Sequence, residues 1–329
     1  HTTQKYKAVC GVNSRVRFAL TGTPVENRLG ELWSIFSFLM PGYLPPYKSF
    51  CSRFEKPIVQ EEDQTAVRRL NQLTGPFILR RMKSDVLKEL PPKTENVYRI
   101  ELEEEQRKLY LAAVVDAREK LQAAKPEDKM AVFAVLMRLR EICCDPRLIA
   151  DNWEGGSAKL DACAELVSSA VEGGHRILLF SQFTSMLELL AKRLDAEGIS
   201  HFTLQGSTPK PVRAELVRRF NGGEVSVFLI SLRAGGTGLN LTAADIVIHY
   251  DPWWNVAAQN QATDRAYRIG QQNPVQVYKL IAQDTIEEKI VELQQAKQSL
   301  ADTVTGTADG AILSMRPDEL LQLLEGSEP

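Results

Sequence analysis

The sequence predicts an α/β fold whose main domain is a doubly wound parallel sheet between about residues 157 and 283. In this stretch, short apolar runs such as 176–182 and 225–232 alternate with helical patterns of about 10 to 15 residues, which is typical of βαβ units. The runs are apolar throughout, as expected for strands that are buried on both faces of a parallel sheet. We therefore expect helices on both faces of one sheet.

The elements of this domain follow in order from the same patterns. The expected strands are 176–182, 201–205, 225–232, 245–250 and 275–282, and the expected helices are 158–171, 184–197, 209–220 and 255–267. A long last helix is expected from about 284 to 300, because Asp284 and Thr285 offer a cap that is followed by the acid Glu287.

The first half of the chain is predicted to be mostly helical. We expect a strand at 15–20 that ends at Thr21-Gly22-Thr23-Pro24, and another strand at 97–102. The expected helices are 31–40, 64–88 in two pieces broken at Gly75-Pro76, and 103–148 with a break at 125–128. The loop 151–156 then marks a domain boundary.

The bulk composition bounds the class of protein. A length of 329 residues suggests about two globular domains, and 44% hydrophobic with 25% charged residues is ordinary for a globular chain. The net charge of −2 means that any contact with nucleic acid must come from local basic clusters. Candidates are the run from Arg80 to Lys83 and the group Arg213, Arg218 and Arg219.

Cysteine usage and hydropathy indicate the compartment. The five cysteines, with one adjacent pair at Cys143-Cys144, have neither metal-ligand nor disulfide-scaffold spacing, so a reducing cytosolic or nuclear compartment is expected. No apolar run approaches the length of a membrane span, and no signal peptide opens the chain. The chain begins with His1 inside what reads as a running sequence, so we expect a fragment of a longer protein.

A glycine-rich turn follows the apolar run 227–232. It reads Ser231-Leu232-Arg233-Ala234-Gly235-Gly236-Thr237-Gly238-Leu239-Asn240-Leu241. Ligands of open α/β sheets bind outside the carboxyl ends of the strands, and glycines let backbone N–H groups approach a phosphate closely. By itself the turn is equally compatible with a tight strand-to-helix connection.

Two arginines stand three residues apart within Gln261-Ala262-Thr263-Asp264-Arg265-Ala266-Tyr267-Arg268-Ile269-Gly270-Gln271. On a helix, Arg265 and Arg268 would share one face and reach one anion together. The alternative is a solvated helix face on which Asp264 is a salt-bridge partner.

These two segments resemble the fifth and sixth motifs of the SWI/SNF-type family of superfamily-two DNA translocases. Leu20 to Asn27 resembles the third motif, Leu178 to Phe183 the fourth, Leu204 to Thr208 the hydroxyl-rich turn that follows it, and Tyr250 to Asn255 a coupling element. Tyr267 departs from the pattern, because many relatives carry His there.

The resemblance implies a RecA-like fold with a family-specific helical protrusion. Residues 1–90 would be a C-terminal remnant of RecA-like lobe one with linker helices, and 91–156 the linker and helical protrusion. Residues 157–283 would be RecA-like lobe two, and 284–329 a C-terminal brace helix and tail.

The resemblance also implies roles for residues. Arg265 and Arg268 would be arginine fingers, and Gly236, Gly238, Gln261 and Asp264 would contact the nucleotide. The backbone of DNA would be contacted by Thr21, Gly22, Thr23, Gln205, Gly206, Ser207, Thr208, Arg233, Ala234, Gly235, Asn240 and Trp253. No metal ligand is expected in this chain.

The implied activity is that of an ATP-dependent translocase on double-stranded DNA that remodels protein–DNA complexes. The chain holds no Gly-Lys-Thr or Gly-Lys-Ser phosphate loop and no strand-end Asp-Glu box. ATP and Mg²⁺ would therefore bind the complete motor, none would bind tightly to this fragment, and the fragment alone would be inactive.

The expected partners are duplex DNA bound through its backbone, the missing N-terminal RecA-like lobe and a protein target on DNA, with no membrane. The absence of long insertions favours a prokaryotic, nucleoid-associated protein of the cytoplasm. A eukaryotic member would be nuclear. Two alternatives stay open: a strand-separating helicase of the same superfamily, or a non-catalytic DNA-binding module.

Overall fold

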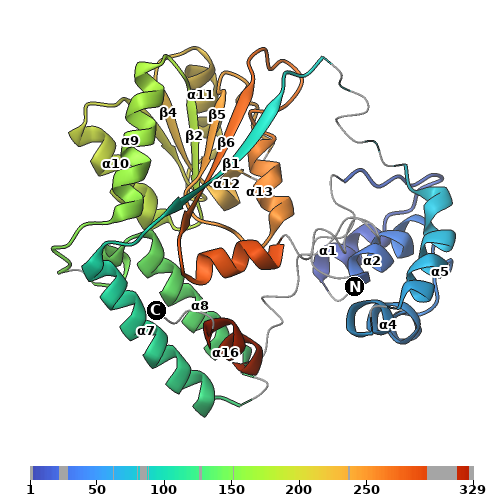
Figure 1. The fold of residues 1–329 in the computed structure, drawn as a ribbon. Coiled ribbons are helices and arrows are strands. Elements are labelled where there is room, and N and C mark those ends of the chain that lie inside the picture. Colours follow the sequence, from blue (N-terminus) through green and yellow to red (C-terminus); the bar gives the residue numbers. More distant parts are fainter. Residues whose placement is uncertain are drawn as a thin grey trace. The chain divides into compact units, whose positions relative to one another are not determined.

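The computed structural model describes residues 3–21, 29–61, 63–79, 81, 87, 89–125, 128–150, 152–235, 238–294 and 317–325 (Figure 1). The described residues up to 81 belong to one compact unit, and those from 87 to 293 belong to a second unit that also takes in 317–325. Among the helices in these ranges, none is both long and apolar enough to cross a lipid bilayer.

The first unit is helical. Its elements are α1 (Gln4–Cys10), α2 (Leu29–Leu39), α3 (Tyr47–Phe50), a π-helical turn (Cys51–Glu55), α4 (Lys56–Gln60), α5 (Gln64–Thr74) and a 3₁₀ turn (Gly75–Phe77). Leu32, Phe36, Phe50 and Leu70 are buried in its core. The expected helix at 31–40 is confirmed, and the break at Gly75-Pro76 ends α5.

The strand expected at 15–20 is wrong, because these residues have irregular backbone. Phe18 is 83% exposed and Leu20 is 98% exposed. A strand is stabilised by a neighbour that accepts its N–H groups. The described residues of this unit contain no other strand that offers such a ladder. Beyond the 3₁₀ turn, Ile78 and Leu79 are not helical, and most of 80–88 lies outside the described residues.

The second unit is built on a six-stranded, fully parallel sheet with the order β1-β6-β5-β2-β4-β3. The strands are β1 (Lys93–Ile100), β2 (Ile177–Ser181), β3 (His201–Leu204), β4 (Val227–Ser231), β5 (Ile246–His249) and β6 (Val275–Ala282). The predicted doubly wound parallel sheet is confirmed. The strand expected at 97–102 begins earlier and ends earlier, and it adds an edge strand from upstream of residue 157.

Helices cover both faces of this sheet (Figure 1). On one face, α9 (Ala158–Glu172) and α10 (Thr184–Ala196) pack against Ile177 and Leu179 of β2. On the other, α11 (Lys210–Asn221), α12 (Leu232–Gly235) and α13 (Val256–Thr263) bury Leu178 and Phe180. Alternate residues of β2 therefore enter two different cores, and this explains why the strand is apolar from Ile177 to Phe180.

The helical protrusion consists of α7 (Glu104–Ala123) and α8 (Lys129–Cys144), followed by a 3₁₀ turn (Pro146–Leu148). The predicted break at 125–128 is confirmed, and the side chain of Asp128 accepts a hydrogen bond from the Ala131 N–H that begins α8. Helix α16 (Pro317–Glu325) packs on α7 and α8, where Arg118 Nη2 donates to the carbonyl of Leu324 over 2.8 Å.

The last predicted helix is described from 286 to 294, and the rest of its expected range lies outside the described residues. The predicted cap is present in altered form. The Thr285 hydroxyl accepts from the Glu287 N–H, whereas the Glu287 carboxylate accepts from the Ala282 N–H. Glu287 therefore fixes the end of β6 as well as the start of this helix.

Candidate nucleotide and DNA interface

The loops with chemically distinctive residues lie at one edge of the sheet. Because β2, β3, β4 and β5 are parallel and adjacent, their carboxyl ends meet there. The loops are 182–183 after β2, 205–208 after β3, 238–241 beyond α12, and 250–255 after β5. The fold thus brings together four of the predicted motifs.

The glycine-rich turn begins with the short helix α12. Arg233 is exposed, whereas Ala234 is buried against the sheet core. Gly238 has a φ of +41°, in the left-handed region that favours glycine. Asn240 is exposed, and its carbonyl accepts from the Asn221 side chain over 2.8 Å. Gly235 lies on α12, and Gly236 lies outside the described residues.

The two arginines lie beyond the helix that was expected to carry them. Helix α13 ends at Thr263, so Arg265 and Arg268 sit in the turn that follows, and the expected helix 255–267 is wrong at its carboxyl end. The backbone N–H groups of Arg265 and Ala266 donate to carbonyls three residues back, those of Ala262 and Thr263, so the four-residue ladder of the helix stops there. The carbonyls that follow are bound by other segments. The carbonyl of Arg265 accepts from Leu241 N–H over 2.9 Å, and that of Ala266 accepts from the Gln271 side chain over 3.1 Å.

This arginine turn (residues 264–270) is fastened to the glycine-rich segment from both sides. Arg268 Nη1 donates to the carbonyl of Leu239 over 2.9 Å, and Leu241 N–H donates back to the carbonyl of Arg265. Arg265 is only 6% exposed. Burial, and then the positive charge of Arg268, lower the pKa of Arg265 below its ordinary value. A buried and a half-buried cation held close together in this way favour binding of a multiply charged anion.

Gln261 and Asp264 lie close to the arginine turn in sequence. Gln261 is exposed on α13, and the Asp264 N–H caps the end of this helix by donating to the carbonyl of Asn260 over 2.8 Å. Their nucleotide role stays a prediction.

The turn after β3 is closed by its own hydrogen bonds. The Gln205 N–H donates to the Thr208 hydroxyl over 3.0 Å, and Thr208 N–H donates to the Gln205 carbonyl. Gly206 and Ser207 are exposed at its tip. Arg213 of α11 donates to the carbonyls of Gly206 and Thr208, each over 2.7 Å. The sequence analysis treated Arg213 as part of a basic cluster, whereas this side chain shapes the turn.

The two tryptophans after β5 have different environments. Trp253 is half-buried and Trp254 is 4% exposed, with their ring centroids 4.5 Å apart. Beneath them lies Arg140 of α8, which is fully buried and whose guanidinium carbon is 4.6 Å from the Trp254 ring centroid. Arg140 could not be recognised from the sequence, because the apolar spacing of α8 gives no sign that one of its arginines is buried.

Thr21 is exposed in the first unit, and Gly22 and Thr23 lie outside the described residues. The predicted DNA contacts of the third motif therefore stay a prediction. They belong to a different compact unit from the loops described above.

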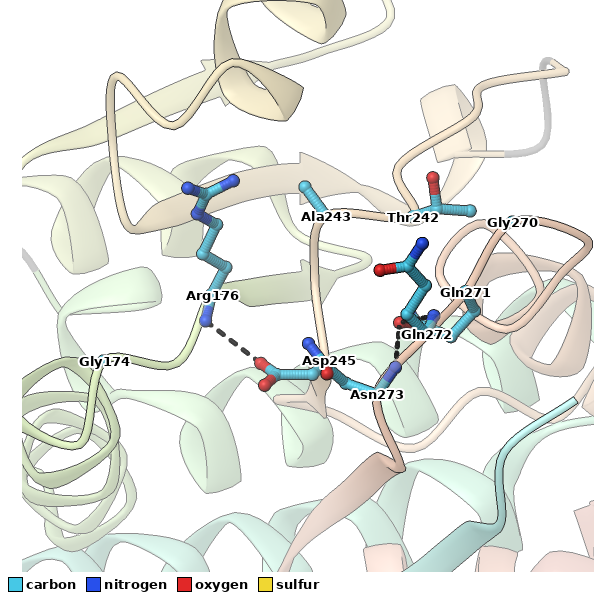
Figure 2. Close-up of a pocket in the computed structure, with 9 residues that line it drawn as sticks. All are labelled: Gly174, Arg176, Thr242, Ala243, Asp245, Gly270, Gln271, Gln272 and Asn273. Carbon is cyan, nitrogen blue, oxygen red and sulfur yellow. Dashed lines mark hydrogen bonds between the residues drawn. The ribbon is translucent and has the colours of Figure 1, made fainter.

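A cavity of about 340 Å³ lies at the opposite edge of the sheet, at the amino ends of β2, β5 and β6 (Figure 2). Its lining includes Arg176, Thr242, Asp245, Gln272 and Asn273. The Asp245 carboxylate accepts from the backbone N–H of Arg176 over 3.1 Å and contacts His175 Nδ1 over 2.8 Å. No residue that the sequence analysis assigned to a ligand lines this cavity.

Comparison with known proteins places these observations in a family. The chain matches the SNF2-related domain over residues 1–148 and the helicase conserved C-terminal domain over residues 158–270. Together, the two matches cover both halves of the chain and include the glycine-rich segment and the arginine turn.

Curated relatives come from bacteria and animals. An uncharacterized ATP-dependent helicase of Mycoplasma genitalium is 39% identical over 97% of this chain, and the putative ATP-dependent helicase/translocase YwqA of Bacillus subtilis is 40% identical over 98%. A human SWI/SNF-related matrix-associated actin-dependent regulator of chromatin, subfamily A member 1, is 37% identical over 94%. The chain spans 31%, 36% and 31% of the length of these relatives, respectively.

Solved structures agree. The SWI2/SNF2 ATPase core of Sulfolobus solfataricus in complex with dsDNA is 35% identical, with a TM-score of 0.61, and the match covers 97% of this chain and 68% of that one. The C-terminal part of the Fun30 ATPase domain is 25% identical, with a TM-score of 0.52, over 62% of this chain and 89% of that one. The chain belongs to the SWI2/SNF2 family of ATPases.

Proposed function

We propose that this chain is the C-terminal portion of an ATP-dependent motor that translocates along double-stranded DNA and remodels protein–DNA complexes. The observation that carries the proposal is the joining of the arginine turn to the glycine-rich segment through Arg268 and Leu241. The joining holds two cations beside a glycine-rich backbone at the edge of a RecA-like sheet, where a phosphate can be bound.

In this proposal, Arg265 and Arg268 act as arginine fingers on the γ-phosphate. Arginine suits the role because its planar guanidinium holds two oxygens at once and keeps its charge. Gly236, Gly238, Gln261 and Asp264 would line the same side of the nucleotide. ATP with Mg²⁺ supplies the phosphoanhydride bond whose hydrolysis drives the motor.

The residues present fit the phosphate end of ATP but not its metal. Among the described residues, no group of three or more His, Cys, Asp or Glu side chains is placed to hold a metal ion. We assign the Mg²⁺ ligands to the first RecA-like lobe of the complete motor. Residues 1–90 would then be the remnant of that lobe, 91–156 the linker and protrusion, 157–283 lobe two and 284–329 the brace and tail. The chain alone would not hydrolyse ATP at a useful rate.

DNA would be bound through its backbone. The exposed turn at Gly206 and Ser207 and the exposed Arg233 lie at the same sheet edge, where N–H, hydroxyl and guanidinium donors can contact phosphates without reading bases. Gln205, Thr208, Ala234, Gly235, Asn240 and Trp253, with Thr21, Gly22 and Thr23 of the first unit, complete the proposed contact set. The Sulfolobus solfataricus relative was solved with dsDNA, which supports a duplex as the partner. We place the protein with the nucleoid if it is prokaryotic and in the nucleus if it is eukaryotic.

Phosphate release by the full-length protein of this reading frame, with and without duplex DNA, tests the proposal. We expect strong stimulation by duplex and a loss of about 10³-fold or more in kcat for Arg268→Ala. Arg193→Ala is the matched control, because Arg193 is half-exposed on α10 and paired with Asp161 and Glu197. This control variant should retain stimulation.

Two results would favour the alternatives. Hydrolysis accompanied by separation of a forked duplex would indicate a strand-separating helicase. The absence of hydrolysis with any nucleic acid, in a folded full-length protein, would contradict the motor and favour a DNA-binding module.

A further inference from the structure

Arg140 of the protrusion reaches from α8 into the loops that follow β2 and β5. Its Nη1 donates to Gln182 Oε1 over 2.9 Å. Its Nη2 donates to Asp251 Oδ2 over 3.1 Å and to the Pro252 carbonyl over 2.7 Å. Arg140 and Asp251 have fully buried side chains, so the protrusion is joined to the sheet edge by a desolvated ion pair.

Asp251 is held independently of Arg140. Its Oδ1 accepts from the Ser181 hydroxyl over 2.6 Å and from the Gln182 N–H over 3.1 Å. Ser181 is the last residue of β2, and β2 is the strand next to β5. The carboxylate is therefore fixed to the rigid sheet, and it provides a firm anchor for the guanidinium.

The guanidinium in turn supports the tryptophans. Its central carbon lies 4.6 Å from the Trp254 ring centroid, 5.6 Å from that of Trp253 and 5.3 Å from that of Phe183. Phe133, two turns earlier on α8, meets Trp254 edge to face with centroids 6.2 Å apart. These residues form a cation–aromatic cluster that spans the protrusion and the tryptophan loop (residues 251–254).

The cluster is not arranged for maximum stability. Arg140 Nε and the Trp254 indole N–H are both buried, and neither has a hydrogen-bond partner among the described residues. Unsatisfied buried donors are costly, and a buried ion pair adds little net stability. Packed apolar residues in place of both Arg140 and Asp251 would avoid the unsatisfied Nε and the cost of the buried ion pair, so the pair serves the geometry of the loop.

The tryptophan loop leads directly to the arginine turn. Asn255 follows Trp254 and caps α13, with its side chain accepting from the Ala258 N–H. Helix α13 runs from Val256 to Thr263, and Arg265 lies two residues after its end. A displacement of the loop is therefore passed along α13 toward the arginines, which are also fastened to the glycine-rich segment.

We propose that Arg140 is a positioning residue that locks the tryptophan loop to the protrusion and so couples movement of the protrusion to the arginine turn. The coupling part rests on the proposed motor function. Arg140 touches neither the nucleotide nor the DNA in this scheme. Its loss separates hydrolysis from movement along DNA.

The test compares Arg140→Lys and Arg140→Gln with Arg138→Lys and Arg138→Gln in the full-length protein. Arg138 is exposed on the same helix and serves as the matched control. Two rates are measured at a temperature at which circular dichroism shows each variant to be folded: duplex-stimulated phosphate release, and displacement of a third strand from a triplex ahead of the motor. We expect the displacement per ATP hydrolysed to fall at least fivefold in both Arg140 variants and to stay unchanged in the Arg138 variants.

A merely structural role would lower both rates in proportion and leave their ratio unchanged, and that result would overturn the proposal. Lysine keeps the charge but has a single nitrogen, which cannot occupy the positions of both Nη1 and Nη2 that bind Gln182, Asp251 and Pro252. If Arg140→Lys kept the wild-type displacement per ATP hydrolysed, that result would therefore also contradict the proposal.

Hydrogen exchange separates this proposal from the motor itself. In the Arg140 variants, amides of 253–263 should exchange at least tenfold faster than in the Arg138 variants, whereas those of α10 should not change. If the wild-type protein fails to hydrolyse ATP, the motor proposal falls, and this measurement still decides whether Arg140 positions the loop. Unchanged exchange in 253–263 would overturn the positioning role. Should Arg140→Gln fail to fold, Gln182→Leu removes one acceptor and should give a smaller acceleration of the same segment.

Discussion

His249 is a titratable residue that the fold keeps neutral. Its ring is 2% exposed, Nε2 lies 2.8 Å from the Thr263 hydroxyl, and the imidazole stacks on Phe180. Burial, and then the nearby charge of Lys279, lower its pKa to about 3. The neutral ring thus ties β5 to the last residue of α13, directly before the arginine turn.

This shift predicts a specific dependence of stability on pH. Because the folded pKa lies below the unfolded value of about 6.5, the unfolded chain binds more protons between these values. The stability that the neutral His249 ring contributes is therefore fully present above pH 6.5 and is lost as the pH falls toward 3. Between pH 6.5 and 5, urea unfolding of the wild type should lose roughly 2 kcal/mol relative to His249→Gln. His201→Gln is the control, and a wild-type slope equal to that of His249→Gln would disprove the assignment.

The pair Lys159–Glu287 is a second buried pair of residues, and both side chains are fully buried. Burial raises the pKa of Glu287, and the charge of Lys159 and the Ala282 N–H partly offset this effect. Lys159→Met alone should cost about 3 to 5 kcal/mol, because it leaves a buried carboxylate unpaired. The double variant Lys159→Met, Glu287→Leu should recover most of this loss in urea unfolding. Additive losses in the double variant would show that the two residues act independently.

At the scale of elements, the position of α13 depends on its two ends. Its carboxyl end is fixed by tertiary hydrogen bonds to Leu241 and Gln271, whereas its amino end is fixed locally by Asn255. The local end is the easier one to test without disturbing the arginine turn.

Asn255→Ala should lower the free energy of unfolding by about 1 kcal/mol, because the Ala258 N–H loses its acceptor. Asn255→Asp preserves an acceptor oxygen and should stay within a few tenths of the wild type. Chemical denaturation of both variants measures the difference. Equal destabilisation by Asp and Ala would mean that the side chain has a role other than the cap.

On the scale of the whole molecule, the two compact units have separate cores. The first is built around Phe36, Phe50 and Leu70, whereas the second surrounds the two faces of the parallel sheet. No residue belongs to both sets among those that the structure describes. We therefore expect the units to unfold separately.

Phe36→Ala tests this independence. Removing the ring from a fully packed site should cost the first unit about 3 to 5 kcal/mol. Native-state hydrogen exchange should show that loss at amides of α2 and α5, while amides of β2 and β4 keep wild-type protection. A fall of similar size in the hydrogen-exchange protection of both units would indicate one cooperative structure.

The difference between the confirmed and the wrong predictions has a physical origin. Strands β2 and β4 were predictable because a strand buried on both faces must be apolar at each position, and that requirement is written in adjacent residues. The strand expected at 15–20 is partly apolar, but it has no neighbouring strand among the described residues. Apolar composition alone does not form a strand.

In the candidate site too, the predictable features are local in the sequence and the unpredictable ones depend on distant residues. The glycine-rich and arginine segments were recognisable, since each is a continuous string with unusual residue types. The placement of the arginine turn depends on partners about 24 to 29 positions away in the sequence. Arg268 donates to Leu239, and Leu241 donates to Arg265 just beyond the end of α13. Arg140 meets Asp251 across 111 positions, and nothing next to Arg140 in the sequence marks it.

The sequence by itself determined the parallel α/β sheet, the helical protrusion and the residue types that a phosphate-binding edge requires, because these depend on local hydrophobic periodicity and on glycine and arginine chemistry. The tertiary structure alone decided where α13 ends, that Arg265 is buried, and that Arg140 supports the tryptophan loop. Those features arise from hydrogen bonds that other segments make to backbone carbonyls, and from the desolvation of the two arginine side chains. Both depend on groups that only the folded chain brings together.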